Sequence, residues 1–102
     1  MRRAEEDIPM DKKNKAVVTV VGNDTIGIIA RVSAALAAHN ANILDISQTV
    51  LSGMFNMMMI VDVTAISQSF GDVAEELEQV GEAIGVKVKI QREDIFTKMH
   101  RI

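Results

Sequence analysis

The chain has 102 residues, no cysteine, 48% hydrophobic residues, 25% charged residues and a single proline. This length fits one domain with one core, and the apolar content excludes a disordered chain, which has too few apolar groups to offset its ordering entropy. The absence of cysteine excludes a disulfide scaffold, a thiolate metal site and a cysteine nucleophile. Eleven basic and fourteen acidic residues give a net charge of −3. Because the basic residues form no block, we expect no nucleic-acid binding.

The amino-terminal residues 1–15 are charged, contain the proline and show no periodicity. We interpret them as a flexible extension that precedes a single domain of residues 16–102. They lack the apolar stretch of a signal peptide, and no apolar run approaches the roughly 20 residues that cross a bilayer, so we expect a cytoplasmic protein without membrane contact. Met10 is a candidate alternative start, which mass spectrometry of native protein with only the Met1 start would contradict.

The first half of the domain changes from a strand pattern to a helix pattern. Residues 16–21 are rich in valine and end at Gly22, which predicts a strand. From Gly27 to His39 the apolar residues recur at three- and four-residue spacing, which predicts a helix that ends at Asn40. The positions expected to face the core are Ile28 or Ile29, Val32, Leu36 and His39.

A hairpin is predicted next. Residues 42–51 and 54–63 are strand-like, and Ser52-Gly53 between them is a short hairpin signal. On the second arm every alternate residue is apolar, which indicates a face directed into the core. That face consists of Phe55, Met57, Met59, Val61 and Val63.

The last part of the chain predicts a second helix and a fourth strand. After Ser67 the apolar residues again step by three and four, and glutamates occupy the opposite, solvated side until Gly85. Residues 86–91 alternate apolar and polar without error, as a strand with one wet face does. A final helical turn or two is expected, with Ile95, Phe96 and Met99 on its apolar side. The core positions of the second helix are Phe70, Val73, Leu77, Val80 and Ile84, and its glutamates are Glu75, Glu76, Glu78 and Glu82.

This order predicts a ferredoxin-like βαββαβ sandwich of the α+β class with a short carboxy-terminal helix. Right-handed crossovers place both main helices on one face of a four-stranded antiparallel sheet. The first and third strands are then central, and the second and fourth lie at the edges.

Several functions that such a fold can host are removed by the residues. RNA-recognition modules stack bases on aromatic residues of the central strands, but Phe55 is the only one here and faces the core. A metal chaperone needs cysteines, and an acylphosphatase-like enzyme needs an arginine that the first loop lacks. Neither His39 nor His100 has an evident activating partner in the sequence. We therefore expect a protein that is not an enzyme, with no catalytic residue, no metal and no cofactor.

The segment Gly22-Asn23-Asp24-Thr25-Ile26-Gly27, the first loop, joins the first strand to the first helix. One interpretation is a turn in which Asp24 or Thr25 caps the helix and the glycines allow a tight bend. The other is a ligand site, because free backbone N–H groups at a helix N-terminus suit a carboxylate. The residues alone leave both interpretations open.

The loop with the helix start Gly27-Ile28-Ile29-Ala30, and the segment Ala41-Asn42-Ile43, resemble the amino-terminal half of an ACT domain, a small regulatory module that binds amino acids. The pattern from residue 16 to 102 resembles the short stand-alone ACT proteins and, more distantly, the ACT repeats of the glycine cleavage system transcriptional repressor. The resemblance implies a ligand between the first loop of one subunit and the second strand of its neighbour. Its contacts would be Asn23, Thr25, Ile26 and Gly27 for the carboxylate, and the partner's Asn42, Ile43 and Asp45 for the amino group or side chain, with Asp24 at the site but capping the helix.

Self-association is expected on physical grounds as well. The second strand is an edge strand without the proline or lysine that usually guards one. A contiguous apolar patch is expected on the sheet face away from the helices, formed by Val17, Val21, Met54, Met58 and Ile60. We therefore favour a homodimer that binds a small amino acid and signals to an enzyme or regulator. The alternative is a structural module that binds no ligand and only docks on such a protein.

Overall fold

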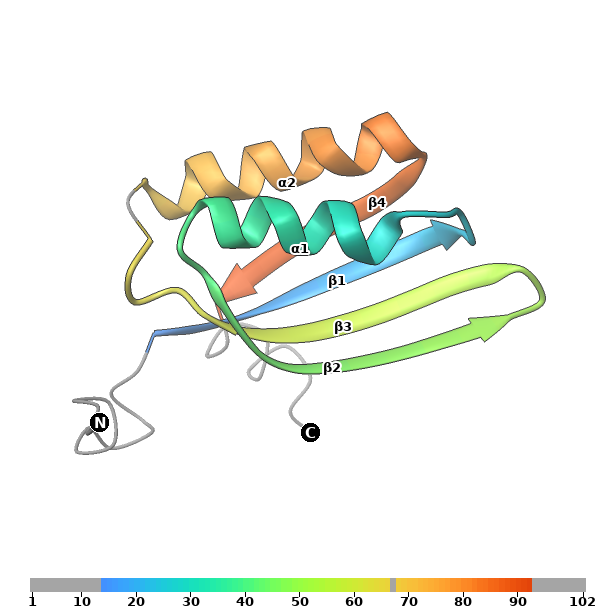
Figure 1. Ribbon diagram of the computed structural model, residues 1–102, viewed down its shortest axis with the longest axis horizontal. Helices are drawn as coiled ribbons and strands as arrows, with labels where there is room; N and C mark the ends of the chain where they lie inside the picture. Colours follow the sequence, from blue (N-terminus) through green and yellow to red (C-terminus); the bar gives the residue numbers. More distant parts are fainter. Residues whose placement is uncertain (1–13, 67, 93–102) are drawn as a thin grey trace.

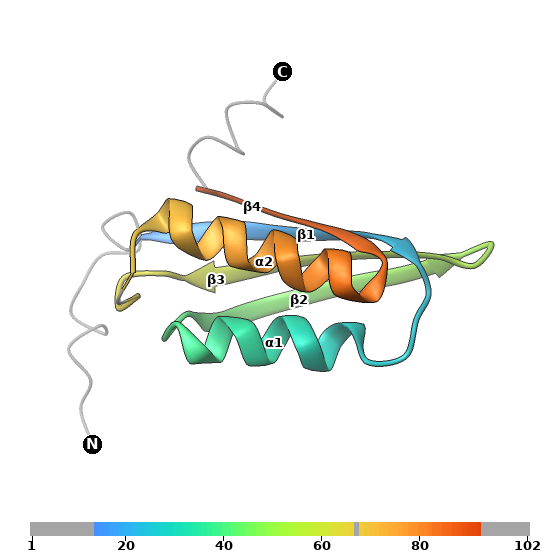
Figure 2. The ribbon, with the colours of Figure 1, turned by 90° about the horizontal axis from the view of Figure 1, so that it is seen from above.

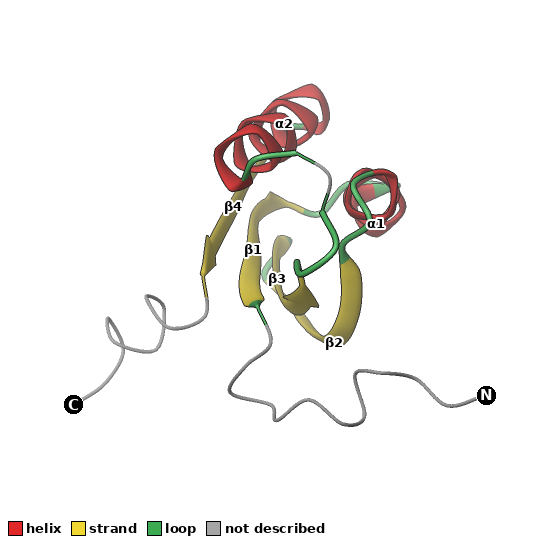
Figure 3. Ribbon diagram, turned by 90° about the vertical axis from the view of Figure 1, so that its left-hand side faces the viewer, coloured by secondary structure: helices red, strands yellow, loops and turns green. Residues whose placement is uncertain are grey.

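The computed structural model describes residues 14–66 and 68–92. The elements are β1 (Lys15–Asn23), α1 (Ile28–Ala38), β2 (Asn42–Leu51), β3 (Met54–Asp62), α2 (Phe70–Ile84) and β4 (Val86–Arg92). Both helices cover one face of the sheet, and Figures 1 and 3 show the two layers. The predicted βαββαβ fold is thereby confirmed. The expected carboxy-terminal helix with Ile95, Phe96 and Met99, and most of the expected amino-terminal extension, lie outside the described residues.

The sheet has the order β2-β3-β1-β4, and all three pairings are antiparallel. The prediction that the first and third strands are central is confirmed. β1 continues two residues past the predicted end at Val21, because Gly22 pairs with Phe55 and Asn23 pairs with Met54. Gly22 also lies against β4, where a Cβ atom would come within 2.8 Å of Val86 Cγ1.

The core lies between the sheet and the helices. The four predicted inward residues within β3, and Val63 directly after it, are all buried, because each alternate side chain points to the helix layer. α1 contributes Ile28 and not Ile29, and α2 buries Val73 and Leu77 completely while Phe70, Val80 and Ile84 are partly buried. The core residues of β1 and β4 are Ala16, Val18, Val20, Val86, Val88 and Ile90.

The opposite sheet face agrees with the expected apolar patch only in part. Val21, Met54 and Met58 are exposed, but Val17 is only 2% exposed. Val17 pairs with Ile60 of β3 and Gln91 of β4, and Ile60 is itself only partly exposed. The expected contiguous patch therefore lacks Val17.

The helix ends differ in how they are capped. α1 ends in a Schellman motif, in which Asn40 has a φ of 64° and the Ala41 N–H donates to the carbonyl oxygen of Leu36 at 2.9 Å. α2 begins with Ser69, whose side chain accepts a hydrogen bond from the Asp72 N–H at 3.1 Å, and ends at Gly85 with a φ of 80°.

Candidate functional site

The first loop is held against the β2–β3 turn. The backbone N–H of Asp24 donates to the carbonyl oxygen of Gly53 at 3.0 Å, and the Thr25 hydroxyl donates to the carbonyl oxygen of Asn23 at 3.1 Å. The next side chain, Ile26, is 99% exposed. The loop therefore has a fixed base and an apolar tip that contacts none of the chain around it.

The expectation that Asp24 or Thr25 caps α1 is wrong. Gly27 occupies the N-cap position with a φ of 92°, no side chain makes a capping hydrogen bond, and the first turn contains no acidic residue. Asp24 and Thr25 lie too early in the chain to reach the first turn, because a cap must stand directly before it. The N-terminal end of α1 consequently carries the positive end of the helix dipole without a side-chain acceptor.

The other predicted ligand contacts lie at the far end of the sheet. Asn42 pairs with Asp62 at the start of β2, whereas the first loop lies at the end where Leu51 pairs with Met54 (Figure 1). The two ends of β2 are about 30 Å apart at roughly 3.3 Å per residue. One chain thus groups residues 23–27 in one place and holds Asn42, Ile43 and Asp45 apart from them.

The start of β2 also contains a β-bulge. Ile43 pairs with Val61 and Asp45 with Ile60, so Leu44 is an extra residue without a partner on β3. A carboxylate oxygen of Asp45 accepts a hydrogen bond from the Ile46 N–H at 2.9 Å. Asp45 therefore has one backbone contact already and keeps further acceptor capacity for a ligand.

The free edge of β2 presents both backbone and apolar groups. Because Leu51 and Met54 flank a two-residue turn, they form a hydrogen-bonded pair. Alternation along the strand then turns the backbone groups of Ile46, Gln48 and Val50 away from β3, where the Ile46 N–H donates to the Asp45 carboxylate. Viewed from above, α1 runs alongside this edge (Figure 2). The exposed large apolar side chains of β2 are Leu44, Ile46, Val50 and Leu51.

One polar contact was not predicted. His39 is buried, and its Nε2 lies 2.8 Å from the carboxylate oxygen Oε1 of Glu76. The sequence placed Glu76 with the other glutamates on the solvated side of α2. The only indication in the sequence was the helical spacing, which predicted His39 on the inner face of the first helix. This spacing did not indicate Glu76 as its partner.

The part of the chain that the structure describes contains neither a cluster of metal-ligating side chains nor a helix that could span a membrane. No group of three or more His, Asp or Glu side chains there is arranged to hold a metal ion. Neither described helix combines the length and the apolar character that a membrane span requires.

Comparison with known proteins decides the family. The model of the ACT domain family matches residues 14–91. The chain belongs to the ACT domain family. A UPF0237 protein of Bifidobacterium longum is 60% identical over 89 residues, which cover 87% of this chain and 99% of that protein. The resemblance inferred from the first loop and the start of β2 is confirmed.

Solved structures agree with this assignment. An ACT domain protein from Streptococcus pneumoniae is 44% identical with a TM-score of 0.73, over 83% of this chain and 96% of that one. A putative glycine cleavage system transcriptional repressor is 23% identical with a TM-score of 0.65, over 79% of this chain and 46% of that one. The second comparison shows a shared fold. This ACT chain therefore has the architecture of a regulatory module.

Proposed function

We propose that this ACT chain forms a two-fold dimer and binds a small amino acid at the interface, as a regulatory module rather than an enzyme. The observation that carries the proposal is the separation of the predicted contacts. The first loop lies at one end of β2, and Asn42 and Asp45 lie at the other. A second copy is the simplest way to complete the site.

The free edge of β2 allows a second copy to pair with it and so to complete the site. Two β2 strands that pair antiparallel about a two-fold axis run in opposite directions, so the start of one lies beside the end of the other. The end of β2 leads into the β2–β3 turn, to which Asp24 of the first loop is hydrogen bonded. Asn42, Ile43 and Asp45 of the partner copy then approach residues 23–27.

The chemistry of the two halves suits the two ends of an amino acid. The uncapped start of α1 and the backbone of Asn23, Thr25, Ile26 and Gly27 offer N–H groups and a positive dipole to a carboxylate. Asp45 offers an acceptor to an ammonium group, and its carboxylate is exposed. A ligand held by both copies stabilises the dimer geometry that binds it, and this linkage transmits its presence to an enzyme or regulator in the cytoplasm.

The alternative is a structural module that docks on an enzyme or regulator without binding a ligand. Thermal-shift screening with the twenty amino acids separates the two, since a selective and saturable rise in melting temperature supports the sensor. A uniform lack of response supports the docking module.

A mixing experiment tests whether the site is shared between copies. Ile26→Asp places a negative charge in the loop, and Asp45→Lys places a positive charge at the start of β2; both side chains are exposed, so both variants fold. Neither variant alone binds the amino acid found in the screen. After subunit exchange, half the dimers have one intact site, and titration calorimetry finds about a quarter of the wild-type binding capacity. A mixture that binds nothing overturns the shared site.

A further inference from the structure

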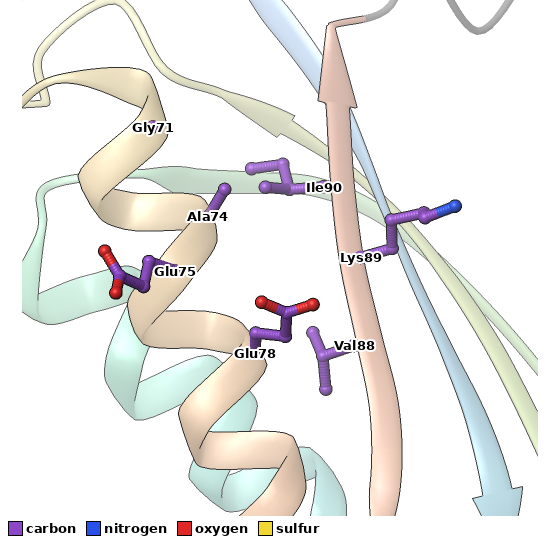
Figure 4. A pocket seen from close by; sticks show the side chains of 7 residues that line it. All are labelled: Gly71, Ala74, Glu75, Glu78, Val88, Lys89 and Ile90. Carbon is purple, nitrogen blue, oxygen red and sulfur yellow. The ribbon is translucent and has the colours of Figure 1, made fainter.

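The sheet has a second face, opposite the helices, which we call the helix-free face. Among the described residues, no helix or strand is packed on it (Figure 3). Figure 4 shows Val88 and Ile90 of β4 directed toward α2 and Lys89 directed away from it. By alternation Gln91 shares the face of Lys89, and so does Val17 of β1, which pairs with Gln91. Val17 accordingly lies on the helix-free face and is not part of the core between sheet and helices.

The strands beside Val17 do not account for its burial. Val21 lies on the same strand and the same face and is 43% exposed, whereas Val17 is 2% exposed. A side chain on a sheet stands roughly perpendicular to it, so strand neighbours flank the side chain and only a layer packed on that face covers it. Both valines have a strand neighbour on each side, namely Asn56 and Lys87 for Val21 and Ile60 and Gln91 for Val17. The same flanking thus leaves one valine open, and the other needs a cover.

Burial on this face increases toward one end of the sheet. On β4, Lys89 is exposed and Gln91 is partly buried. On β3, Met58 is 40% exposed and Ile60 is partly buried. In both strands the more buried residue lies closer to the end of the sheet at which β4 finishes, at Arg92. The cover of Val17 therefore lies over that end.

Two segments outside the described residues adjoin this end in sequence, residues 1–13 before β1 and residues 93–102 after β4. Residues 1–13 are mostly charged and have no apolar period, whereas Ile95, Phe96 and Met99 recur at the spacing of one helix side. Ile95 follows Gln91 by four residues. At about 3.3 Å per residue, four residues reach well beyond the strand spacing of about 4.8 Å that separates Gln91 from Val17.

We propose that residues 93–102 fold back onto the helix-free face and cover Val17 with their apolar side. That side consists of Ile95, Phe96 and Met99. The contact removes apolar surface of both partners from water, and it leaves Val21, Met54 and Met58 as the open part of the face. The inference goes beyond the proposed function, because it requires neither a ligand nor a second copy.

Introduced thiols test the contact directly, since the chain has no cysteine. In the full chain, Val17→Cys is combined in turn with Ile95→Cys, Phe96→Cys and Met99→Cys. At least one pair forms a disulfide within the chain under mild oxidation, because a disulfide joins Cβ atoms about 4 Å apart. The same three substitutions combined with the control Val21→Cys give at most about a tenth of that yield.

The same assay identifies the rival covers. A disulfide of Val17→Cys with Ile8→Cys or Met10→Cys means that the amino-terminal segment is the cover. Disulfides between chains mean that a second copy is the cover. Either result overturns the proposal, and so does the absence of a disulfide in all three pairs of Val17→Cys with the carboxy-terminal segment.

The reaction rate of a single thiol provides a second test in the full chain. Val17→Cys reacts with a soluble thiol reagent at least about tenfold more slowly than Val21→Cys, because reactivity requires access. Adding Ile95→Asp with Phe96→Asp raises the rate at Val17→Cys at least about tenfold, since carboxylates do not pack over a valine. An unchanged rate overturns the proposal.

Two controls separate uncovering from unfolding. Ile8→Asp with Met10→Asp makes the same chemical change in the amino-terminal segment and changes the rate at Val17→Cys less than about twofold. Val18→Cys places a thiol in the core under the helices, where Val18 is fully buried. Its slow reaction in the Ile95→Asp, Phe96→Asp background shows that the domain stays folded. A rise at Val17→Cys caused by the amino-terminal pair would assign the cover to residues 1–13 and overturn the proposal.

Discussion

His39 Nε2 and Glu76 Oε1 lie 2.8 Å apart and join the C-terminal end of α1 to α2. His39 is buried, and Glu76 is about half exposed. The contact is the only side-chain link between the two helices that has polar groups at both ends among the residues that the structure describes. It adds a polar contact to the apolar packing that both helices make with the core.

A double-mutant cycle measures this contact. His39→Ala and Glu76→Ala each lower the free energy of unfolding, and the cycle gives a coupling of about 1 kcal/mol, as expected for one partly exposed hydrogen bond. Urea denaturation of the four proteins measures it. Glu75→Ala is the matched control, since Glu75 has no partner in the described chain, and its cycle with His39→Ala gives no coupling. Equal couplings would show that the contact is not formed in solution.

Substitution by alanine is expected to change the free energy of unfolding in opposite directions at the two glycines of α2. Gly81→Ala forces a methyl group against Val86 and Val88, and it lowers the free energy of unfolding by about 2 kcal/mol although alanine favours the helix. Gly71→Ala meets open space and raises that free energy by about 0.5–1 kcal/mol. Thermal and urea denaturation of the two variants compare them. Destabilisation by Gly71→Ala would contradict the open space around Gly71.

The N-terminal ends of α1 and α2 are capped differently, so substitutions there are expected to differ in their effect on stability. Ser69→Ala removes the hydroxyl that accepts from the Asp72 N–H and lowers the free energy of unfolding by about 1 kcal/mol. Asp24→Ala changes it by less than about 0.5 kcal/mol, because the Asp24 side chain caps nothing and its backbone N–H still donates to Gly53. Urea denaturation measures both. A large loss of stability in Asp24→Ala would show that Asp24 caps α1, as the sequence suggested.

Lysine substitutions on the free edge of β2 test the proposed dimer. Ile46→Lys with Val50→Lys puts two cations on an exposed edge that has no lysine, and raises the dimer dissociation constant by at least about tenfold without loss of stability. Analytical ultracentrifugation measures the dissociation constant. Gln79→Lys, on the exposed side of α2, leaves it unchanged. A monomeric wild-type chain at micromolar concentration would remove the proposed dimer itself.

The fold was predictable because its signals are local. Each strand and helix has its own period, and the hairpin turn at Ser52-Gly53 has the positive φ angles that such a turn requires. The resemblance rested on the first loop and the start of β2, and both segments lie within the matched family region. The ligand contacts on these segments stay a prediction.

The features that were missed depend on distances between elements. Asp24 is a good capping residue by type, but its place in the loop was set by the hydrogen bond to Gly53, which is far away in sequence. Glu76 has the spacing of a solvated residue, and only the position of α1 gives it His39 as a partner. The close approach of α2 to β4 likewise depends on contacts between elements, because a Cβ atom on Gly81 would lie 2.6 Å from the Val86 carbonyl oxygen.

The position of β1 in the sheet also governs how the chain folds. β1 is the first strand in the sequence, yet its two neighbours come much later, since Lys15 pairs with Asp62 and Ala16 pairs with Arg92. Pairings of such long sequence separation form slowly, because the intervening chain must close before they stabilise anything. During synthesis β1 can pair with β3 before β4 is made, but its other edge gains a partner, and the four-stranded sheet is complete, only after translation of Arg92.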